Sequence, residues 1–143
     1  MCTRLDMFSR YRHWLNLPPV LFQRVYKKTR PVPEGKAEMI RLGNDIQRVA
    51  ELFPDNESIE SVALEKFFTK YEIAYAKATE NPKVTLAGLF SLKESLVKAG
   101  ASHTTYLDLE ITHDKSGAPI FYGFLVSISH SGNYASSVAL KIS

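Results

Sequence analysis

The sequence predicts an α+β protein in which an antiparallel sheet packs against one long helix, with an added N-terminal helical arm. Residues 85–100 have the spacing and the end signals of a single helix. Residues 125–140 alternate as two strands joined by a Ser-Gly-Asn turn, which is typical of an antiparallel hairpin. Residues 1–38 differ in charge from the rest of the chain. With 143 residues, the chain is long enough for one domain with a modest core.

The helix predicted at residues 85–100 has a marked beginning and end. Thr85 is a suitable N-cap and Gly100 a suitable C-terminal stop. Its apolar stripe consists of Leu86, Leu89, Phe90, Leu96 and Val97. Glu94 lies beside this stripe, and Lys98 follows one turn later on the same face. This spacing fits a surface ion pair, and it also fits a metal-binding carboxylate with a lysine for a phosphate.

The residues before this helix are expected to supply a strand and several helical turns. Alternating apolar residues predict the strand: Ile40, Leu42 and Ile46. Asp45 lies where the pattern changes to helical spacing, so a helix N-cap is one interpretation of this residue. Residues 58–78 are predicted to be helical, and Thr69 with Glu72 has the pattern of a capping box.

The residues after the long helix are expected to form strands and turns. Alternation predicts one strand at residues 106–111 and another at 120–122, with a turn at 114–117. His113 is expected to be a solvated histidine in the turn region.

The closing block, residues 125–140, contains a second group of candidate functional residues. Ser127 and Ser129 occupy alternate positions and therefore face the same side of their strand. His130 follows them, and a hydrogen-bonded histidine at the end of a strand is its simplest interpretation. The two hydroxyls and the imidazole would also suit a phosphate group.

The charge of the chain is unevenly distributed. The formal net charge is +3, and residues 1–38 hold eight basic and three acidic residues, or 8 − 3 = +5, so the remainder carries 3 − 5 = −2. We predict a basic arm at residues 1–38, built as a helical hairpin with solvated charges. Aromatic residues lie between the basic ones, a pattern that also occurs in segments that bind nucleic acid or a membrane surface. We keep these two partners as less favoured alternatives to the hairpin.

The composition indicates a cytoplasmic protein. No apolar run approaches the roughly 20 residues of a membrane span, and the first residues lack a secretory signal. Cys2 is the only cysteine, which excludes a disulfide framework and a Cys-rich zinc site.

The long helix resembles the signature helix of the holo-acyl-carrier-protein synthases, which are small 4'-phosphopantetheinyl transferases. That family has a Phe, two residues, Lys-Glu, three residues and Lys-Ala. The matching residues are Phe90, Lys93, Glu94, Lys98 and Ala99. Further blocks follow the family order: an opening strand from Met39 with Asp45, a Phe-Thr to Glu-Ile segment at residues 68–73, a Gly-x-Pro at 117–119, and a Ser-Ile-Ser-His at 127–130.

The resemblance implies both a fold and a reaction. Residues 39–143 would form the transferase-like domain, and residues 1–38 would be an addition. The 4'-phosphopantetheine group of coenzyme A would pass to a serine of an apo acyl carrier protein and leave adenosine 3',5'-bisphosphate. Fatty-acid, polyketide and specialised lipid carriers all remain open. The resemblance also implies a homotrimer with active sites between subunits.

The resemblance assigns roles to individual residues. Asp45 and Glu94 would bind Mg²⁺, and either Glu94 or a metal-bound water would deprotonate the carrier serine. His130 would contact the nucleotide or a phosphate, with an acid/base role. The residues implied in binding coenzyme A are Lys93, Lys98, Gly117, Pro119, Ser127, Ser129 and His130.

Three departures from the family pattern lead to an alternative function. Leu89 stands where the family usually has an arginine, and Arg48 and Glu51 roughly reverse the usual charges of the carrier-docking surface. Residues 120–126 replace a longer segment that usually contains a helix. The alternative is a catalytically weakened module of the same fold that binds coenzyme A or a carrier protein. The basic arm would then be a candidate substitute docking surface.

Overall fold

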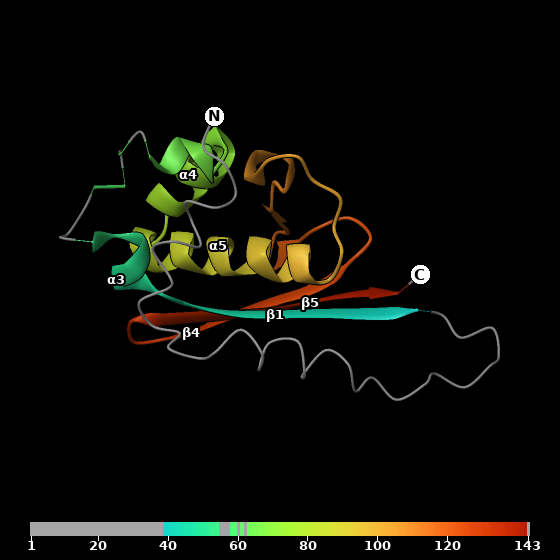
Figure 1. The fold of residues 1–143 in the computed structure, drawn as a ribbon. Helices are drawn as coiled ribbons and strands as arrows, with labels where there is room; N and C mark the ends of the chain where they lie inside the picture. Colours follow the sequence, from blue (N-terminus) through green and yellow to red (C-terminus); the bar gives the residue numbers. More distant parts are fainter. Residues whose placement is uncertain (1–38, 55–57, 60, 62, 143) are drawn as a thin grey trace, which may run out of the picture. The chain divides into compact units, whose positions relative to one another are not determined.

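The computed structural model describes residues 39–54, 58–59, 61 and 63–142, all within one compact unit, Glu38–Ser143. The arm predicted at residues 1–38 lies outside the described residues. The predicted α+β class is confirmed, because an antiparallel sheet packs against one long helix (Figure 1).

Three antiparallel strands form the main sheet in the order β1-β5-β4. They are β1 (Ile40–Arg48), β4 (Leu125–Ser131) and β5 (Tyr134–Ile142). β5 is central, since β1 pairs along one of its edges and β4 along the other. The turn between β4 and β5 starts at Gly132, whose φ of 55° suits a tight hairpin turn that requires a positive φ. The predicted hairpin is thus confirmed.

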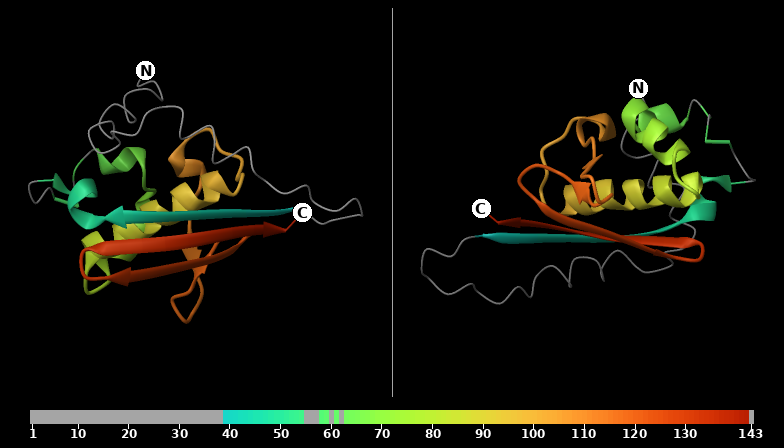
Figure 2. Two further views of the ribbon diagram at one scale, coloured as in Figure 1. Left: turned by 60° about the horizontal axis from the view of Figure 1, so that its bottom comes forward. Right: turned by 180° about the vertical axis from the view of Figure 1, so that it is seen from behind.

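The long helix α5, Pro82–Lys98, lies along one face of this sheet (Figures 1 and 2). The prediction that Thr85 caps it is wrong, because Asn81 is the N-cap residue. Pro82 stands at the start of the helix, where a fixed φ and a missing N–H are favourable. Gly100, the predicted stop, has a φ of 85°, which a glycine adopts without steric cost.

Helix and sheet approach each other closely where small residues line both. A Cβ atom on Gly43 of β1 would lie 1.8 Å from the carbonyl oxygen of Ser95 on α5. The Ser137 hydroxyl of β5 lies 2.8 Å from the Ser91 hydroxyl and 2.7 Å from that of Ser95. These buried hydroxyls satisfy one another, so polar groups are accommodated inside the interface.

A second layer covers the side of α5 that faces away from the sheet. The helix α4, Lys70–Lys77, packs there, after the 3₁₀ turn η2, Leu64–Lys66 (Figure 1). The capping box of Thr69 and Glu72 is confirmed. The long helical region predicted at residues 58–78 is therefore reduced to short pieces, and the four-residue helix α3, Val49–Leu52, precedes them.

The residues after α5 differ from the prediction. Residues 106–111 do not form a strand, because Tyr106–Asp108 is a 3₁₀ turn (η3). The Asp108 carboxylate closes this turn by accepting hydrogen bonds from the backbone N–H groups of Thr104 and Thr105. A small two-stranded sheet follows, made of β2 (Thr112–His113) and β3 (Pro119–Ile120).

The core consists of apolar residues from α5 and from the segments packed around it. Its fully buried members include Leu86, Leu89, Leu92, Leu96, Leu109 and Ile111. The apolar stripe predicted for the long helix is thus the centre of the core. Among the described residues, no helix has the length and apolar character needed to cross a membrane.

Candidate active site

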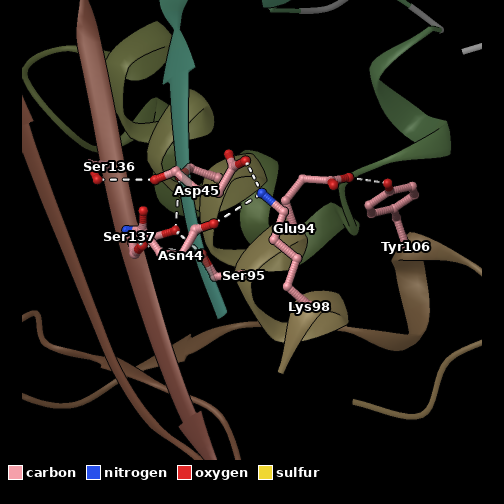
Figure 3. Close-up of polar contacts among 9 residues, drawn as sticks. Asn44, Asp45, Glu94, Ser95, Lys98, Tyr106, Ser136 and Ser137 are labelled. Atoms are coloured by element: carbon pink, nitrogen blue, oxygen red, sulfur yellow. Dashed lines mark hydrogen bonds and ion pairs between the residues drawn. The ribbon is translucent and has the colours of Figure 1, made fainter. Parts of the chain in front are cut away.

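Three of the predicted site residues, Asp45, Glu94 and Lys98, lie together where β1 passes the C-terminal half of α5 (Figure 3). Asp45 is inside the strand, so it does not cap a helix; Arg48 is the N-cap residue of α3. Glu94 and Lys98 come from successive turns of α5. Strand and helix therefore present two carboxylates and one ammonium group to the same region.

Lys98 is paired with Asp45. Its Nζ lies 2.8 Å from Oδ1 of Asp45 and 3.0 Å from the carbonyl oxygen of Asn44. The predicted surface ion pair between Glu94 and Lys98 is thus replaced by a pair that links helix to strand. The Lys98 side chain is 47% exposed and that of Asp45 is 16% exposed, so the ammonium group remains accessible to an anionic ligand.

The central strand β5 holds the backbone of β1 in place at Asp45. Nδ2 of Asn44 donates to the carbonyl oxygen of Ser137 at 2.7 Å, and Oγ of Ser136 donates to the carbonyl oxygen of Asp45 at 3.0 Å (Figure 3). These hydrogen bonds between β1 and β5 fix the position from which the Asp45 carboxylate projects.

Glu94 is half-buried and accepts a hydrogen bond from the Tyr106 hydroxyl at its Oε1. Figure 3 shows its side chain extending towards Tyr106, whereas Asp45 extends towards the Lys98 nitrogen. The two carboxylates thus have different partners, although they come from adjacent elements.

Lys93 is buried, and its predicted contact with a phosphate is wrong. Its Nζ donates to Oε2 of Glu72 at 2.7 Å and to the carbonyl oxygens of Phe67 and Tyr106 at 2.8 and 2.9 Å. Its three donors are thereby used. Burial lowers the pKa of Lys93, and the Glu72 carboxylate opposes this shift. Lys93 stands three residues after Phe90 on the apolar stripe, and that spacing was the available signal for its burial.

The residues gathered here fit a magnesium ion, provided that a substrate supplies phosphate oxygens. Within the part of the chain that the structure describes, no group of three or more His, Cys, Asp or Glu residues could hold a metal. Mg²⁺ is commonly bound by only one or two carboxylates together with water and substrate phosphates. Asp45 and Glu94 supply those carboxylates, and the Lys98 ammonium group shows that a cation is accommodated beside Asp45.

Gly117 and Pro119 belong to the turn and strand of the β2–β3 hairpin. Gly117 has a φ of 84°, and Pro119 pairs with His113. Hydrogen bonds from the Ser116 hydroxyl and from backbone N–H groups, including that of Ala118, close the turn on Asp114 and lower the pKa of this carboxyl. Gly117 and Pro119 are therefore held in place by a hydrogen-bonded turn.

His113 is not the solvated histidine that was expected. Its ring stacks on Tyr75 of α4, with centroids 3.7 Å apart and planes inclined by 7°. It is partly buried, and this burial lowers the pKa of His113, against the opposing effect of Asp114. The stack attaches the hairpin to α4.

Ser127, Ser129 and His130 lie on β4, which is separated from β1 by the central strand β5. The two serines are exposed, and alternation along the strand places His130 on the opposite face. The expectation that these three groups together meet one phosphate therefore does not fit the strand geometry.

Tyr106 and Glu72 are the residues of this region whose roles the sequence analysis missed. Glu72 was expected only to cap a helix. Its carboxylate also accepts hydrogen bonds from the buried Lys93 ammonium group and from the backbone N–H of Ile111. Tyr106 reaches Glu94 only because the chain turns back after α5. No periodic spacing signals such a contact.

Comparison with known proteins identifies the family. The family model described as "4'-phosphopantetheinyl transferase superfamily" matches residues 41–139, which is more than half of the chain. A holo-[acyl-carrier-protein] synthase from Thermoanaerobacter sp. (strain X514) is 34% identical over 116 residues, covering 68% of this chain and 81% of the relative. The synthase from Streptococcus agalactiae serotype III (strain NEM316) is 37% identical over 112 residues, covering 69% and 93%.

Solved structures agree with this result. A crystal structure of a holo-(acyl-carrier-protein) synthase from Bacillus anthracis str. Ames in complex with CoA (3',5'-ADP) is similar with a TM-score of 0.60 and 26% identity. The similarity covers 75% of this chain and 99% of that one. The chain thus belongs to the 4'-phosphopantetheinyl transferase superfamily and, within it, to the holo-[acyl-carrier-protein] synthases, a family of transferases.

Proposed function

We propose that this chain transfers the 4'-phosphopantetheine group of coenzyme A to a serine of an apo acyl carrier protein, with Mg²⁺ as the metal. The observation that carries the proposal is the gathering of Asp45, Glu94 and Lys98 where β1 meets α5. This set offers carboxylates for a hard cation and an accessible ammonium group for a phosphate. The relatives named for this reaction support the choice of substrates.

The proposed reaction assigns a task to each of these side chains. The carrier serine oxygen forms a bond to the phosphorus that bears the pantetheine arm, and the bond from that phosphorus to the bridging oxygen breaks. Adenosine 3',5'-bisphosphate leaves with that oxygen. Glu94 takes the serine proton, and Lys98 exchanges Asp45 for a phosphate oxygen. Bound Mg²⁺ supplies charge neutralisation on the pyrophosphate.

The exposed face of the sheet supports a homotrimer. Ile40, Leu42, Ile46 and Leu125 lie on the face opposite α5 and are 63–66% exposed. A row of apolar side chains of this kind is typical of an interface. Ser127 and Ser129 share that face, so a neighbouring copy would bring them to a site that one chain cannot complete alone. We propose that β4 of one subunit, with His130 at its end, contributes to the site of the next.

The first test is mass spectrometry of an apo carrier protein incubated with the full chain, coenzyme A and Mg²⁺. We expect the carrier to gain one phosphopantetheine group. Asp45→Ala and Glu94→Ala should each abolish the gain while retaining the far-ultraviolet circular dichroism of the fold. A set of several apo carriers that all stay unmodified, with coenzyme A still bound, would contradict the transfer.

One observation favours a second candidate, a catalytically weakened binding module. Leu89 stands where an arginine is usual, and it is buried in the core with 1% exposure. That position therefore offers no guanidinium group to a substrate. The module should bind coenzyme A in calorimetry without modifying any carrier, which separates it from the transferase.

A further inference from the structure

Tyr106 is held at both ends by two consecutive residues of α5. Its carbonyl oxygen accepts a hydrogen bond from Nζ of Lys93 at 2.9 Å, and its hydroxyl donates to Oε1 of Glu94 (Figure 3). Lys93 is buried in the core, whereas Glu94 is only half-buried. The same tyrosine therefore connects the buried ion pair to the predicted metal-binding carboxylate.

The position of the Tyr106 hydroxyl is set by surroundings other than Glu94. The ring lies 5.7 Å from that of Phe90, with planes inclined by 24°, and 5.5 Å from that of Phe67 in an edge contact. The capping box of Thr105 and Asp108 fixes the backbone turn that carries it. Aromatic packing, the turn and the Lys93 bond together leave the ring little freedom.

Glu94, in contrast, is a half-buried glutamate of α5 with several rotatable side-chain bonds. Holding a glutamate side chain in one conformation costs rotamer entropy. A fixed hydroxyl bonded to Oε1 selects one rotamer before any ligand arrives, and it leaves Oε2 for a metal ion or for the proton of a serine. Hydrogen bonds from such outer residues orient the carboxylates of metal sites.

We propose that Tyr106 is a positioning residue that orients the Glu94 carboxylate for divalent-cation binding and transfer. This inference rests on the proposed function of Glu94 as a metal ligand. Lys93, which the family motif places beside Glu94, acts through Tyr106 by fixing its backbone.

The test compares Tyr106→Phe with the wild-type full chain. Phenylalanine keeps the ring and the backbone bond to Lys93 but removes the hydroxyl. Mn²⁺ binding in the presence of coenzyme A is measured by electron paramagnetic resonance, and transfer is followed over a range of Mg²⁺ concentrations. We expect a loss of about 10- to 100-fold in cation affinity or transfer rate. Tyr71→Phe, which alters an exposed tyrosine of α4, is the matched control and should behave as wild type.

Glu94→Gln and the double variant complete a cycle that separates positioning from packing. A packing defect would lower cation binding by the same factor in both backgrounds and would overturn the inference. An effect through Glu94 appears only while the carboxylate is present. Thermal unfolding of each variant identifies any loss of fold.

The outcomes for Tyr106 and for the proposed function can be told apart. Equal Mn²⁺ affinity and equal transfer in wild type and Tyr106→Phe would overturn the positioning role and leave the transfer reaction standing. Wild type that binds Mn²⁺, transfers nothing, and binds it more weakly after Tyr106→Phe would support the positioning role and remove the proposed function. A wild-type chain that binds no Mn²⁺ would overturn the positioning role.

Discussion

Lys93 and Lys98 come from successive turns of α5, but their surroundings differ greatly. Lys93 is fully buried with its pair Glu72, whereas Lys98 is 47% exposed beside Asp45. Removing one member of a buried pair leaves an uncompensated charge, which costs about 3–5 kcal/mol. Exposed pairs contribute at most about 1 kcal/mol. The burial of each lysine therefore determines its part in stability.

We predict that Lys93→Met lowers the free energy of unfolding by about 3–5 kcal/mol and that Lys98→Met lowers it by less than about 1 kcal/mol. In Lys93→Met, Glu72 would remain buried without its ion-pair partner. Its carboxylate would keep the hydrogen bonds from the backbone N–H groups of Thr69 and Ile111. Urea unfolding followed by circular dichroism at pH 7 measures both values. Similar costs for the two variants would show that the buried pair does not stabilise the fold.

The close packing of α5 on the sheet depends on two glycines that face different obstacles. A Cβ on Gly43 would lie 1.8 Å from the backbone carbonyl oxygen of Ser95, whereas one on Gly88 would lie 2.9 Å from the Ile128 side chain. We predict that Gly43→Ala strongly destabilises the fold or prevents folding, because the added Cβ could be accommodated only if the backbone of β1 or α5 moved. Gly88→Ala should cost roughly 1–3 kcal/mol, since a side chain can shift. Thermal unfolding of both variants measures the contrast.

The β2–β3 hairpin is attached to α4 by the stack of His113 on Tyr75. Burial lowers the pKa of His113, so the native state binds a proton less readily than the unfolded chain. The contribution of His113 to the free energy of unfolding is fully present above the unfolded-state pKa of about 6.5. It is lost as the pH falls through the lower pKa of the native state. We predict a larger drop in melting temperature between pH 8 and pH 5.5 for wild type than for His113→Phe.

His113→Phe keeps an aromatic ring but cannot titrate, and the other histidines are common to both proteins. The lowered pKa values of Asp108 and Asp114 place their titration below this pH range. Parallel melting curves for the two proteins across the range would show that His113 does not couple to stability.

The sequence predicted those elements whose signals are local. The long helix, its stop at Gly100, the capping box at Thr69 and the closing hairpin follow from periodicity and turn chemistry, and the structure confirms them. Residues 106–111 were predicted as a strand because a 3₁₀ turn closed by a side chain also places apolar residues at short intervals. Contacts between segments, such as Lys98 with Asp45, depend on the packed fold and have no periodic signal.

At the scale of the whole molecule, the exposed sheet face is a feature that the contacts among the described residues leave unexplained. Leu42 of β1 is opposite Leu140 of β5, which is itself opposite Leu125 of β4, so one apolar row crosses all three strands. Leu42 and Leu125 are 63% and 65% exposed. Water contact over such a row is unfavourable by about 25 cal/mol per Å² of apolar surface, and a second copy of the sheet would remove it.

We predict that Leu42→Lys converts the proposed homotrimer into monomers that retain the fold. The side chain is largely exposed in one chain, so its replacement leaves the core intact, whereas three lysines at one interface repel and need desolvation. Light scattering after size-exclusion chromatography measures the mass, and circular dichroism checks the fold. Leu107→Lys, at an exposed leucine outside the sheet, is the control and should leave the mass unchanged.

If sites are completed by a neighbouring β4, the monomers also lose transfer. Full transfer by monomers would instead place the whole site within one chain, and a trimer that persists would place the interface on another face.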